Sequence, residues 1–190
     1  MASPLDGIRV VDWSTWIVGP EAAALLGDMG AEVIHVEQPG TGDQSRGIRT
    51  SLGVSQTLPT GSNAVYVDHN RNKKGIAVDL TKPEGQEIIY RLVKESDVLI
   101  TNFRRPAGAK LGMDYETLSR INPRLVYAIS SAYGEKGPDA DTPGFAFNVA
   151  AHSGMTMTCS GGVEDPCRIS TGLGDEAGAF LQAMGILGAL

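Results

Sequence analysis

The chain has 190 residues, 42% of them hydrophobic, and a formal net charge of -6 at pH 7. This composition predicts one domain with a single core, or part of a larger domain, and the negative charge argues against a nucleic-acid partner. The cysteines Cys159 and Cys167 have no CxxC spacing and no histidine at metal-ligand spacing, so neither a zinc site nor a disulfide framework is expected. A reducing, cytoplasmic setting fits best.

Neither an export signal nor a membrane anchor is expected. Residues 1–7 contain Pro4 and Asp6 and lack the apolar core of a signal peptide. The apolar run from Ala179 to Leu190 is shorter than the roughly 20 residues that span a bilayer, and it predicts a buried helix. No Gly, Asn or Pro stop signal follows this run, so we expect the native polypeptide to continue.

The first third of the chain predicts a strand, a helix, a second strand and a long loop. Residues 8–12 are rich in β-branched side chains, and residues 21–29 are rich in Ala and Leu, with Gly30 ending the helix. Residues 32–37 alternate as a second strand. Residues 38–62 show no sustained periodicity, so they predict a long loop, a class of segment that often carries function.

The remaining elements continue this alternation. Residues 75–80 predict a strand, and Thr81 to Glu84 match a capping box before a helix with Pro83 in its first turn. Further expected elements are a strand at 97–101, a short helix at 115–121 and a strand at 125–130. The pattern predicts an α/β fold with an open, mainly parallel, Rossmann-like sheet and flanking helices, in which ligands bind beyond the carboxyl ends of strands.

Two charged features near strands have plain alternatives to a ligand site. Glu37 ends a strand where an acidic residue can bind a ribose, but the preceding turn lacks the GxGxxG sequence. We therefore expect Glu37 to be a solvated strand end, and nicotinamide or flavin binding is disfavoured. Arg71, Lys73 and Lys74 precede a strand, and they fit a solvated turn or a phosphate site equally well.

The three histidines show no catalytic pattern. No GxSxG elbow occurs in the chain, so a serine hydrolase is disfavoured. His35 is expected to pack within a strand, His69 to lie in a surface loop, and His152 to be structural.

Asp175 is the most distinctive carboxylate of the chain. It follows Gly172, Leu173 and Gly174 and precedes Gly178 and the last apolar run. At a helix N-terminus, backbone N–H groups and the macrodipole stabilise negative charge, and small neighbours let a ligand come close. Judged on this segment alone, an ordinary N-cap is the favoured interpretation.

Several segments spread over the chain match a known pattern when they are taken in order. They are residues 4–10, 19–20, 26–34, 37 with 40–43, 70–74, 79–80 with 83–85, 97–100 with 102–104, 121–125, and Gly174-Asp175 with Gly178. Together they resemble the class III CoA-transferase family, which includes formyl-CoA and carnitine CoA-transferases and is related to α-methylacyl-CoA racemase. The resemblance implies that residues 1–190 are the N-terminal part of the large CoA-binding domain, with the small domain and the C-terminal return absent from this chain.

The resemblance also implies a reaction and a site. Asp175 would attack an acyl-CoA thioester to form a mixed anhydride, then an aspartyl-CoA thioester that a carboxylic acid acceptor attacks. Coenzyme A enters as part of the substrate, with no tightly bound cofactor and no metal. The positions that match CoA contacts are Trp16, Ile17, Val18, Gln38, Val78, Thr81, Asn102, Phe103, Arg104 and Lys110.

Three departures from relatives narrow the expected chemistry. Gln38 stands where relatives often have arginine, and Ile17 stands where formyl-CoA transferase has glutamine, so formyl and oxalyl substrates are disfavoured. Phe145 stands where the racemase branch needs a histidine, and a phenyl ring cannot exchange a proton. The resemblance implies an interlocked dimer for the full-length protein. The alternative function is a non-catalytic CoA-binding subunit or fragment.

Overall fold

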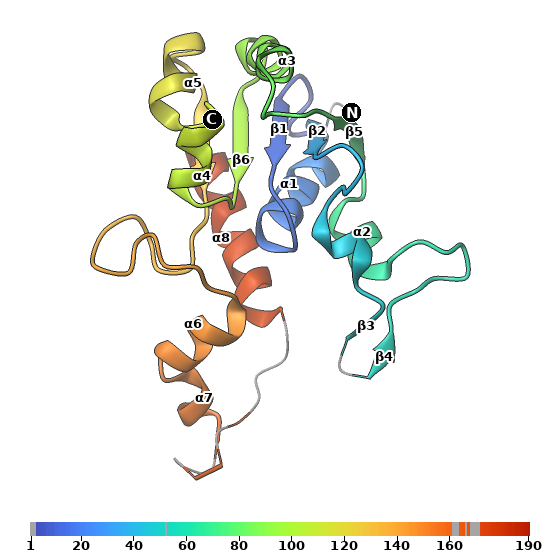
Figure 1. Cartoon of the computed structure of the whole chain (residues 1–190), viewed down its shortest axis with the longest axis vertical. Coiled ribbons are helices and arrows are strands. Elements are labelled where there is room, and N and C mark those ends of the chain that lie inside the picture. The colour runs from blue at the N-terminus through green and yellow to red at the C-terminus, as the bar shows by residue number, and fades with distance from the viewer. Residues whose placement is uncertain (1–2, 52, 161–163, 166, 168–171) are drawn as a thin grey trace.

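The computed structural model describes residues 3–51, 53–160, 164–165, 167 and 172–190. Five strands form a parallel sheet in the order β5-β2-β1-β6-β7, flanked by helices (Figure 1). The strands are β1 Arg9–Trp13, β2 Glu32–Glu37, β5 Lys73–Ala77, β6 Val98–Thr101 and β7 Val126–Ile129. The predicted open, parallel α/β fold is confirmed. The order reverses between β1 and β6, which is a topological switch point.

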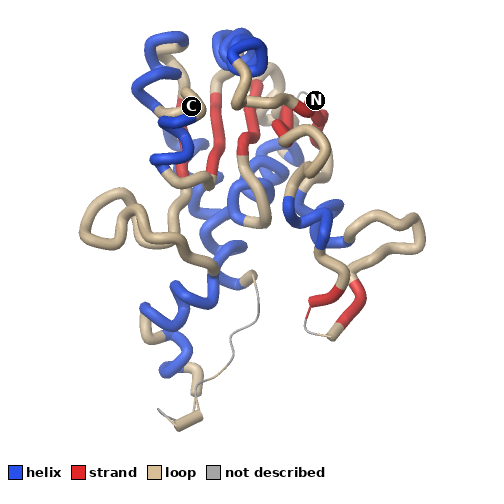
Figure 2. Tube along the Cα trace, in the orientation of Figure 1, coloured by secondary structure: helices blue, strands red, loops and turns tan. Residues whose placement is uncertain are grey.

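Eight helices are present among the described residues. They are α1 Val18–Asp28, α2 Ala64–His69, α3 Pro83–Lys94, α4 Arg105–Lys110, α5 Tyr115–Ile121, α6 Ala146–His152, α7 Met155–Thr158 and α8 Leu173–Ala189. A 3-10 turn, η1 Gln44–Gly47, and the two short strands β3 Thr50–Ser51 and β4 Val54–Ser55 lie within the expected long loop. Figure 2 shows the helices and strands packed together at one end, with α6, α7 and the β3–β4 hairpin extending from the other.

Two apolar layers cover the two faces of the sheet. Successive strand residues point to opposite faces, and the core divides accordingly. One layer joins Val10, Val33, Val98 and Ile100 to α1 and α8, and the other joins Val11, Val36 and Leu99 to α3 and α5. The sheet is therefore buried on both sides, which fixes the positions of the loops at its carboxyl edge.

Several expected boundaries move. β2 and α5 match their predicted bounds, but β5 begins at Lys73 and ends at Ala77, because its register is set by pairing with β2. The prediction of a capping box before α3 is wrong. Lys82 is the N-cap without a side-chain cap, and the Thr81 hydroxyl donates to Asp79 at 2.6 Å.

The predicted burial of the last helix is also only partly right. α8 packs one face on α1, burying Ala179, Ala183 and Ile186. Its other face exposes Leu181 and Met184, at 68% and 67%. No helix of the described residues is both long enough and apolar enough to cross a membrane.

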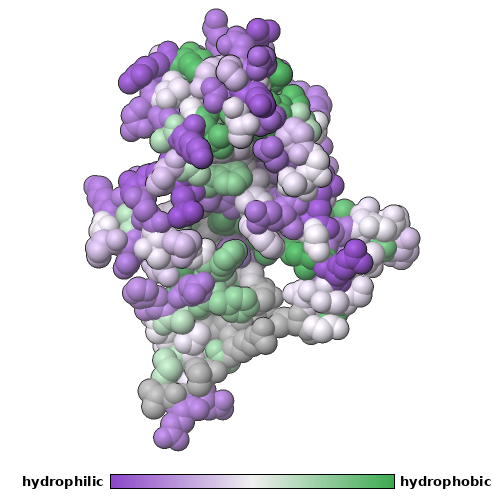
Figure 3. Space-filling model, in the orientation of Figure 1, coloured by the Kyte–Doolittle hydropathy of each residue, from purple (hydrophilic) through white to green (hydrophobic). Residues whose placement is uncertain are grey.

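Apolar side chains also reach the surface away from the sheet. Three apolar side chains at α6 and at the start of α7 are between 42% and 62% exposed. They are Phe145, Phe147 and Met155. In the face shown in Figure 3, hydrophobic residues gather over the region of α6, below a part of the molecule with many hydrophilic residues. Exposed apolar side chains therefore lie at α6 and α7 as well as on α8.

Gly85 is expected to tolerate no side chain. A Cβ there would overlap the backbone carbonyl of Asp79, whereas a Cβ on Gly185 of α8 would meet nothing within 4 Å. We expect Gly85→Ala to cost about 1–3 kcal/mol of unfolding free energy, because α3 must move off the 79–82 turn. Gly185→Ala is the matched control and should leave stability unchanged or slightly higher. Urea unfolding of both variants checks this, and equal stabilities would contradict it.

Candidate active site

The positions expected to contact CoA gather, with one exception, at a single edge of the sheet. Trp16 to Val18 follow β1, Gln38 follows β2, Val78 and Thr81 follow β5, and Asn102 to Arg104 follow β6. These four strands are neighbours and parallel, so their carboxyl ends meet at the same edge. Lys110 is the exception. It ends α4, six residues and about 9 Å along the helix from Arg104.

The two loops at the switch point are tied together by side chains. Asn102 Oδ1 accepts from the Thr15 N–H at 3.0 Å, while Asn102 Nδ2 donates to the Thr15 carbonyl at 2.6 Å. The Phe103 ring packs on Trp13 with centroids 4.6 Å apart. Asn102 and Phe103 therefore support the β1–α1 loop as well as lining the edge.

Asp43 holds the same loop in an unusual conformation. Its Oδ1 accepts from the Thr15 hydroxyl at 3.1 Å, the Trp16 N–H at 3.3 Å and the Ser45 N–H at 2.7 Å. Trp16 has φ of 68°, a left-handed backbone that a bulky residue adopts only under constraint. Local sequence did not identify Asp43 as a support, since its contacts with Thr15 and Trp16 of the loop cross 28 and 27 residues.

A buried ion cluster lies beneath this loop. Asp12 Oδ2 accepts from Lys73 Nζ and His35 Nδ1, each at 2.8 Å, and the Ser14 hydroxyl donates to Oδ1. Burial alone would raise the pKa of Asp12, but the charges of Lys73 and His35 outweigh it and hold this pKa well below its ordinary value. His35 packs within its strand, as expected, and is a member of this cluster.

The basic residues Arg71, Lys73 and Lys74 lie at and just before the start of β5, and each of them forms an ion pair. Lys73 is buried in the cluster with Asp12, and Arg71 pairs with Glu21 at 2.8 Å and with Asp28 at 2.7 Å. Lys74 pairs with Glu32 at 2.6 Å. Their charges join β5 to α1 and β2, so the expectation of a solvated turn is wrong for the buried Lys73, while Lys74 is exposed.

Glu37 is likewise not a solvated strand end. Its carboxylate accepts from the Asp43 N–H at 2.7 Å and from Arg46 at 2.8 Å, and its side chain is 13% exposed. The Arg46 hydrogen bonds are the largest cause that lowers the pKa of Glu37 to about 2, against the raising effect of burial. Glu37 thus anchors the segment that carries Asp43.

The lowered pKa of Glu37 predicts that the fold loses stability in acid. A carboxyl whose folded pKa is depressed contributes stability above its ordinary value of 4.5 and loses it as the pH falls toward about 2. The melting temperature should therefore fall over this window, and it should fall less in Glu37→Gln. Glu87→Gln, in an exposed pair with Arg91, is the control and should behave as the unchanged protein. Thermal melts between about pH 5 and pH 2 decide, and identical pH dependences in all three proteins would contradict the prediction.

Asp175 lies in the first turn of α8, beside the start of α1. The N-cap is Gly172, with φ of 103°, so Asp175 is not the cap itself. A Cβ on Gly178, one turn later on the same side of the helix, would lie 3.1 Å from Val18 Cγ2. A Cβ on Gly174 would lie 3.6 Å from Ala146 of α6. Small residues therefore let α8 approach the β1–α1 region closely, and Asp175 comes with it.

The environment of Asp175 disfavours its ionised form. Burial is the largest cause that raises the pKa of Asp175, the neighbouring Glu176 raises it further, and His69 lowers it. First-turn positions place the carboxylate where free N–H groups and the helix dipole favour negative charge. Asp175 is thus a partly buried carboxylate with a raised pKa, a combination found at reactive sites.

His69 is not a surface-loop residue. It ends α2, is 6% exposed, and its Nε2 lies 3.1 Å from Glu176 Oε1. The contact joins residues 107 positions apart, which no local pattern reveals. His152, by contrast, is exposed on α6, with its ring 5.3 Å from that of Tyr133.

Arg104 and Lys110 are exposed at the N-cap and the last residue of α4. Within the described part of the chain, neither forms an ion pair. Phe145 caps α6 and meets Trp16 edge-on, with ring centroids 6.1 Å apart. The described residues hold no cluster of three or more His, Cys, Asp or Glu side chains that could bind a metal.

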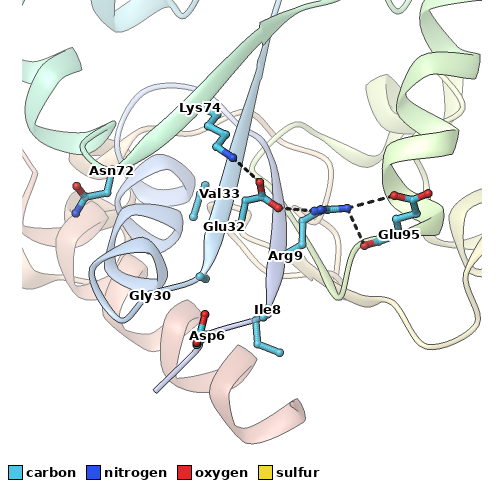
Figure 4. Close-up of a pocket in the computed structure, with 11 residues that line it drawn as sticks. Asp6, Ile8, Arg9, Gly30, Glu32, Val33, Asn72, Lys74 and Glu95 are labelled. Atoms are coloured by element: carbon cyan, nitrogen blue, oxygen red, sulfur yellow. Dashed lines mark hydrogen bonds and ion pairs between the residues drawn. The ribbon is translucent and has the colours of Figure 1, made fainter. Parts of the chain in front are cut away.

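Two pockets of the described residues lie outside the β1–α1 loop. One, of about 550 Å³, lies at the amino ends of β1 and β2 (Figure 4), where Lys74, Glu32, Arg9 and Glu95 form a chain of ion pairs. These charges satisfy one another. A second, of about 880 Å³, lies beside the edge strand β7 and includes Tyr127 and Arg105. Neither contains Asp175 or a residue of the β1–α1 loop.

The fold and site define an α/β protein with a topological switch point in its parallel sheet and a partly buried carboxylate at the start of α8. The model of CoA-transferase family III matches residues 5–190, and the chain belongs to that family.

Named relatives and a solved structure support membership of this family. The chain is 40% identical over 187 residues to a cinnamoyl-CoA:phenyllactate CoA-transferase of Clostridium sporogenes, covering 97% of this chain and 44% of the relative. It is 42% identical over 156 residues to a succinate–glutarate CoA-transferase of Agrobacterium fabrum, covering 82% and 39%. The crystal structure of Rv3272 from Mycobacterium tuberculosis is similar with a TM-score of 0.87 and 39% identity, covering 98% and 51%. The chain thus spans about half the length of the relatives it matches.

Proposed function

We propose that the chain is the CoA-binding, nucleophile-bearing part of an enzyme that moves CoA from an acyl-CoA donor to a carboxylic acid. The observation that carries this proposal is the position of Asp175 in the first turn of α8, close to the β1–α1 loop at the carboxyl edge of the sheet. Membership of CoA-transferase family III supports the reaction class. Residues 1–190 would then be the N-terminal part of the large domain, acting in the cytoplasm.

The proposed reaction uses only the Asp175 carboxylate and the two substrates. A carboxylate oxygen attacks the thioester carbon, the C–S bond breaks, and a mixed anhydride and CoA thiolate form. The thiolate attacks the aspartyl carbonyl, which releases the donor acid and leaves an aspartyl-CoA thioester. The acceptor carboxylate attacks that thioester to form a second anhydride. The thiolate then attacks its acceptor carbonyl, giving the new acyl-CoA and restoring Asp175.

The surroundings of Asp175 suit both its ionised form, which attacks the thioester, and the intermediates that form after the attack. Asp175 must be ionised to attack, and its raised pKa reflects burial that also makes the carboxylate a better nucleophile than a fully solvated one. Free N–H groups of the first turn can stabilise the oxyanion that forms at each attack. No other cofactor takes part in this scheme.

CoA would lie along the four-strand edge. The exposed cations Arg104 and Lys110 would meet its phosphates, and Phe103 would offer an aromatic surface. Gln38 and Thr81 would offer hydrogen bonds at the β2 and β5 end of the edge, while Val78 lies buried behind them. Trp16 to Val18 would contact the part of CoA nearest Asp175.

A second function is a non-catalytic CoA-binding subunit. Two relatives from Chloroflexus aurantiacus are named as the alpha and beta subunits of a succinyl-CoA–L-malate CoA-transferase. Racemization is disfavoured, because Phe145 faces Trp16 where a proton-exchanging imidazole would be needed. For a full-length protein we propose an interlocked homodimer or a related heteromer.

Two measurements on this chain test the proposal. In calorimetric titrations, CoA should bind saturably, dephospho-CoA more weakly, and NADH not at all. After incubation with succinyl-CoA and hydroxylamine, peptide mass spectrometry should find the hydroxamate at Asp175 and none in Asp175→Asn. Asp141→Asn, which changes an exposed aspartate paired with Arg105, is the control and should still be labelled. Preferential NADH binding would overturn CoA binding, and CoA binding without label would favour the non-catalytic subunit.

A further inference from the structure

His69 and Glu176 form a contact that the proposed reaction does not use. His69 Nδ1 lies 2.6 Å from the Val65 carbonyl, four residues earlier on α2, and Nε2 lies 3.1 Å from Glu176 Oε1. The His69 side chain is 8% exposed and that of Glu176 is 41% exposed. The ring is thus fixed by its own helix and presents one edge to the start of α8.

The partners of the two ring nitrogens indicate which protons the pair needs. A carbonyl oxygen only accepts, so Nδ1 donates to Val65. An ionised Glu176 also only accepts, so Nε2 must donate as well. A ring that donates from both nitrogens is a cationic imidazolium, and the contact is then a charge-assisted hydrogen bond.

Asp175 and Glu176 are adjacent in the first turn of α8, and their like charges oppose each other. Glu176 raises the pKa of Asp175, and His69 lowers it. Of the other charged or titratable groups on the neighbouring helices, two have partners of their own and one is exposed to solvent. Glu21 of α1 pairs with Arg71, Asp68 of α2 is exposed, and His152 of α6 stacks against Tyr133. His69, by contrast, contacts this pair of carboxylates through the hydrogen bond between its Nε2 and Glu176.

We propose that His69 is a positioning residue for Asp175: by binding Glu176 it neutralises the neighbouring charge and leaves Asp175 as the available carboxylate at the start of α8. The inference rests on the proposed function for the role of Asp175. It adds that α2, at the end of the long loop, takes part in the site. A change that moved α2 away would leave two uncompensated carboxylates side by side and a less readily ionised nucleophile.

The test is the titration of the Asp175 carboxyl carbon in this chain, followed by NMR and assigned by its loss in Asp175→Asn. His69→Gln keeps a donor toward Glu176 and removes the charge, so the pKa of Asp175 should rise by about 0.5 or more. Glu176→Gln removes the repelling charge, so this pKa should fall by a similar amount. His69→Gln combined with Glu176→Gln should return it toward the unchanged protein. His152→Gln is the matched control and should leave it unmoved.

The Asp175 pKa is expected to shift in opposite directions in His69→Gln and Glu176→Gln, and this distinguishes a positioning role of His69 from a purely structural contact. A structural role would destabilise both variants without moving the Asp175 titration in opposite directions. Glu176 is partly exposed, so Glu176→Gln remains informative if His69→Gln does not fold. An Asp175 pKa that is the same in the unchanged protein and in His69→Gln overturns the inference, and so does one that is the same in Glu176→Gln. The titration uses no substrate, so failure of the proposed reaction would appear only in the hydroxylamine experiment.

Discussion

Replacing Lys73 with methionine is expected to lower the free energy of unfolding by about 3–5 kcal/mol, enough to threaten folding of the chain. The Lys73 ammonium is 2% exposed and lies 2.8 Å from Asp12 Oδ2, the Pro20 carbonyl and Asn70 Oδ1. Methionine fills a similar volume but leaves Asp12 as a buried carboxylate without its lysine. Removing one partner of a buried pair costs more than the pair itself contributes.

Lys74→Met is the matched control for this prediction. Lys74 is the next residue, but its side chain is 73% exposed, so its pairing with Glu32 is screened by solvent and contributes little to stability. Combining Lys73→Met with Asp12→Asn should recover part of the lost stability, because the buried charge is then removed together with its partner. Denaturant unfolding of the three variants measures this. Equal losses for Lys73→Met and Lys74→Met would contradict the assigned burial.

The ion cluster also concerns function, because it lies below the β1–α1 loop. Asp12 is the fourth residue of β1, and Ser14, which donates to it, begins the loop that carries Trp16. Asp43 then fixes Trp16 from the other side. Two buried carboxylates, one on each side, therefore hold the loop proposed to contact CoA. Such prearrangement reduces the ordering cost of binding.

The fold could be predicted from the sequence because each strand and helix of an α/β sheet is marked by its own local hydrophobic pattern and flanking residues. Alternation in residues 32–37 placed β2, and Tyr115 to Ile121 gave α5 with its bounds. Both elements are fixed by their own side chains and the caps beside them, such as Asp114 at the start of α5. The bounds of the short strand β5 differ from the predicted ones because its register depends on pairing with β2, which lies about 40 residues away in the sequence.

The supports of the candidate site could not be predicted in this way. Lys73 meets Asp12 across 61 positions, and His69 meets Glu176 across 107. A charged residue near a turn has the same local sequence whether it faces water or an ion partner, so burial decides its role only after folding. The Asp175 position and the CoA contacts came from family resemblance, and their roles stay predictions.

Replacing Asp175 with asparagine is expected to abolish CoA exchange in the full-length enzyme while making the fold more stable. Loss of a nucleophile typically costs roughly 10³-fold or more in rate, and an amide cannot attack a thioester as a carboxylate does. CoA affinity should be nearly unchanged, because the proposed CoA contacts lie on other residues. Asp141→Asn is the control for the removal of a negative charge at an exposed position, and it should retain exchange.

The stability gain follows from the direction of the Asp175 pKa. Burial raises this pKa, so the neutral form favours folding below the ordinary value of 3.8, and that contribution is lost as the pH rises through the folded pKa. At pH 7 the ionised carboxylate therefore weakens the fold, and a neutral amide of the same shape removes that cost. Thermal melts of this chain should show a higher midpoint for Asp175→Asn at pH 7, with the difference shrinking toward pH 3. A lower midpoint would contradict the raised pKa of Asp175, and exchange at the unchanged rate would contradict its role as the nucleophile.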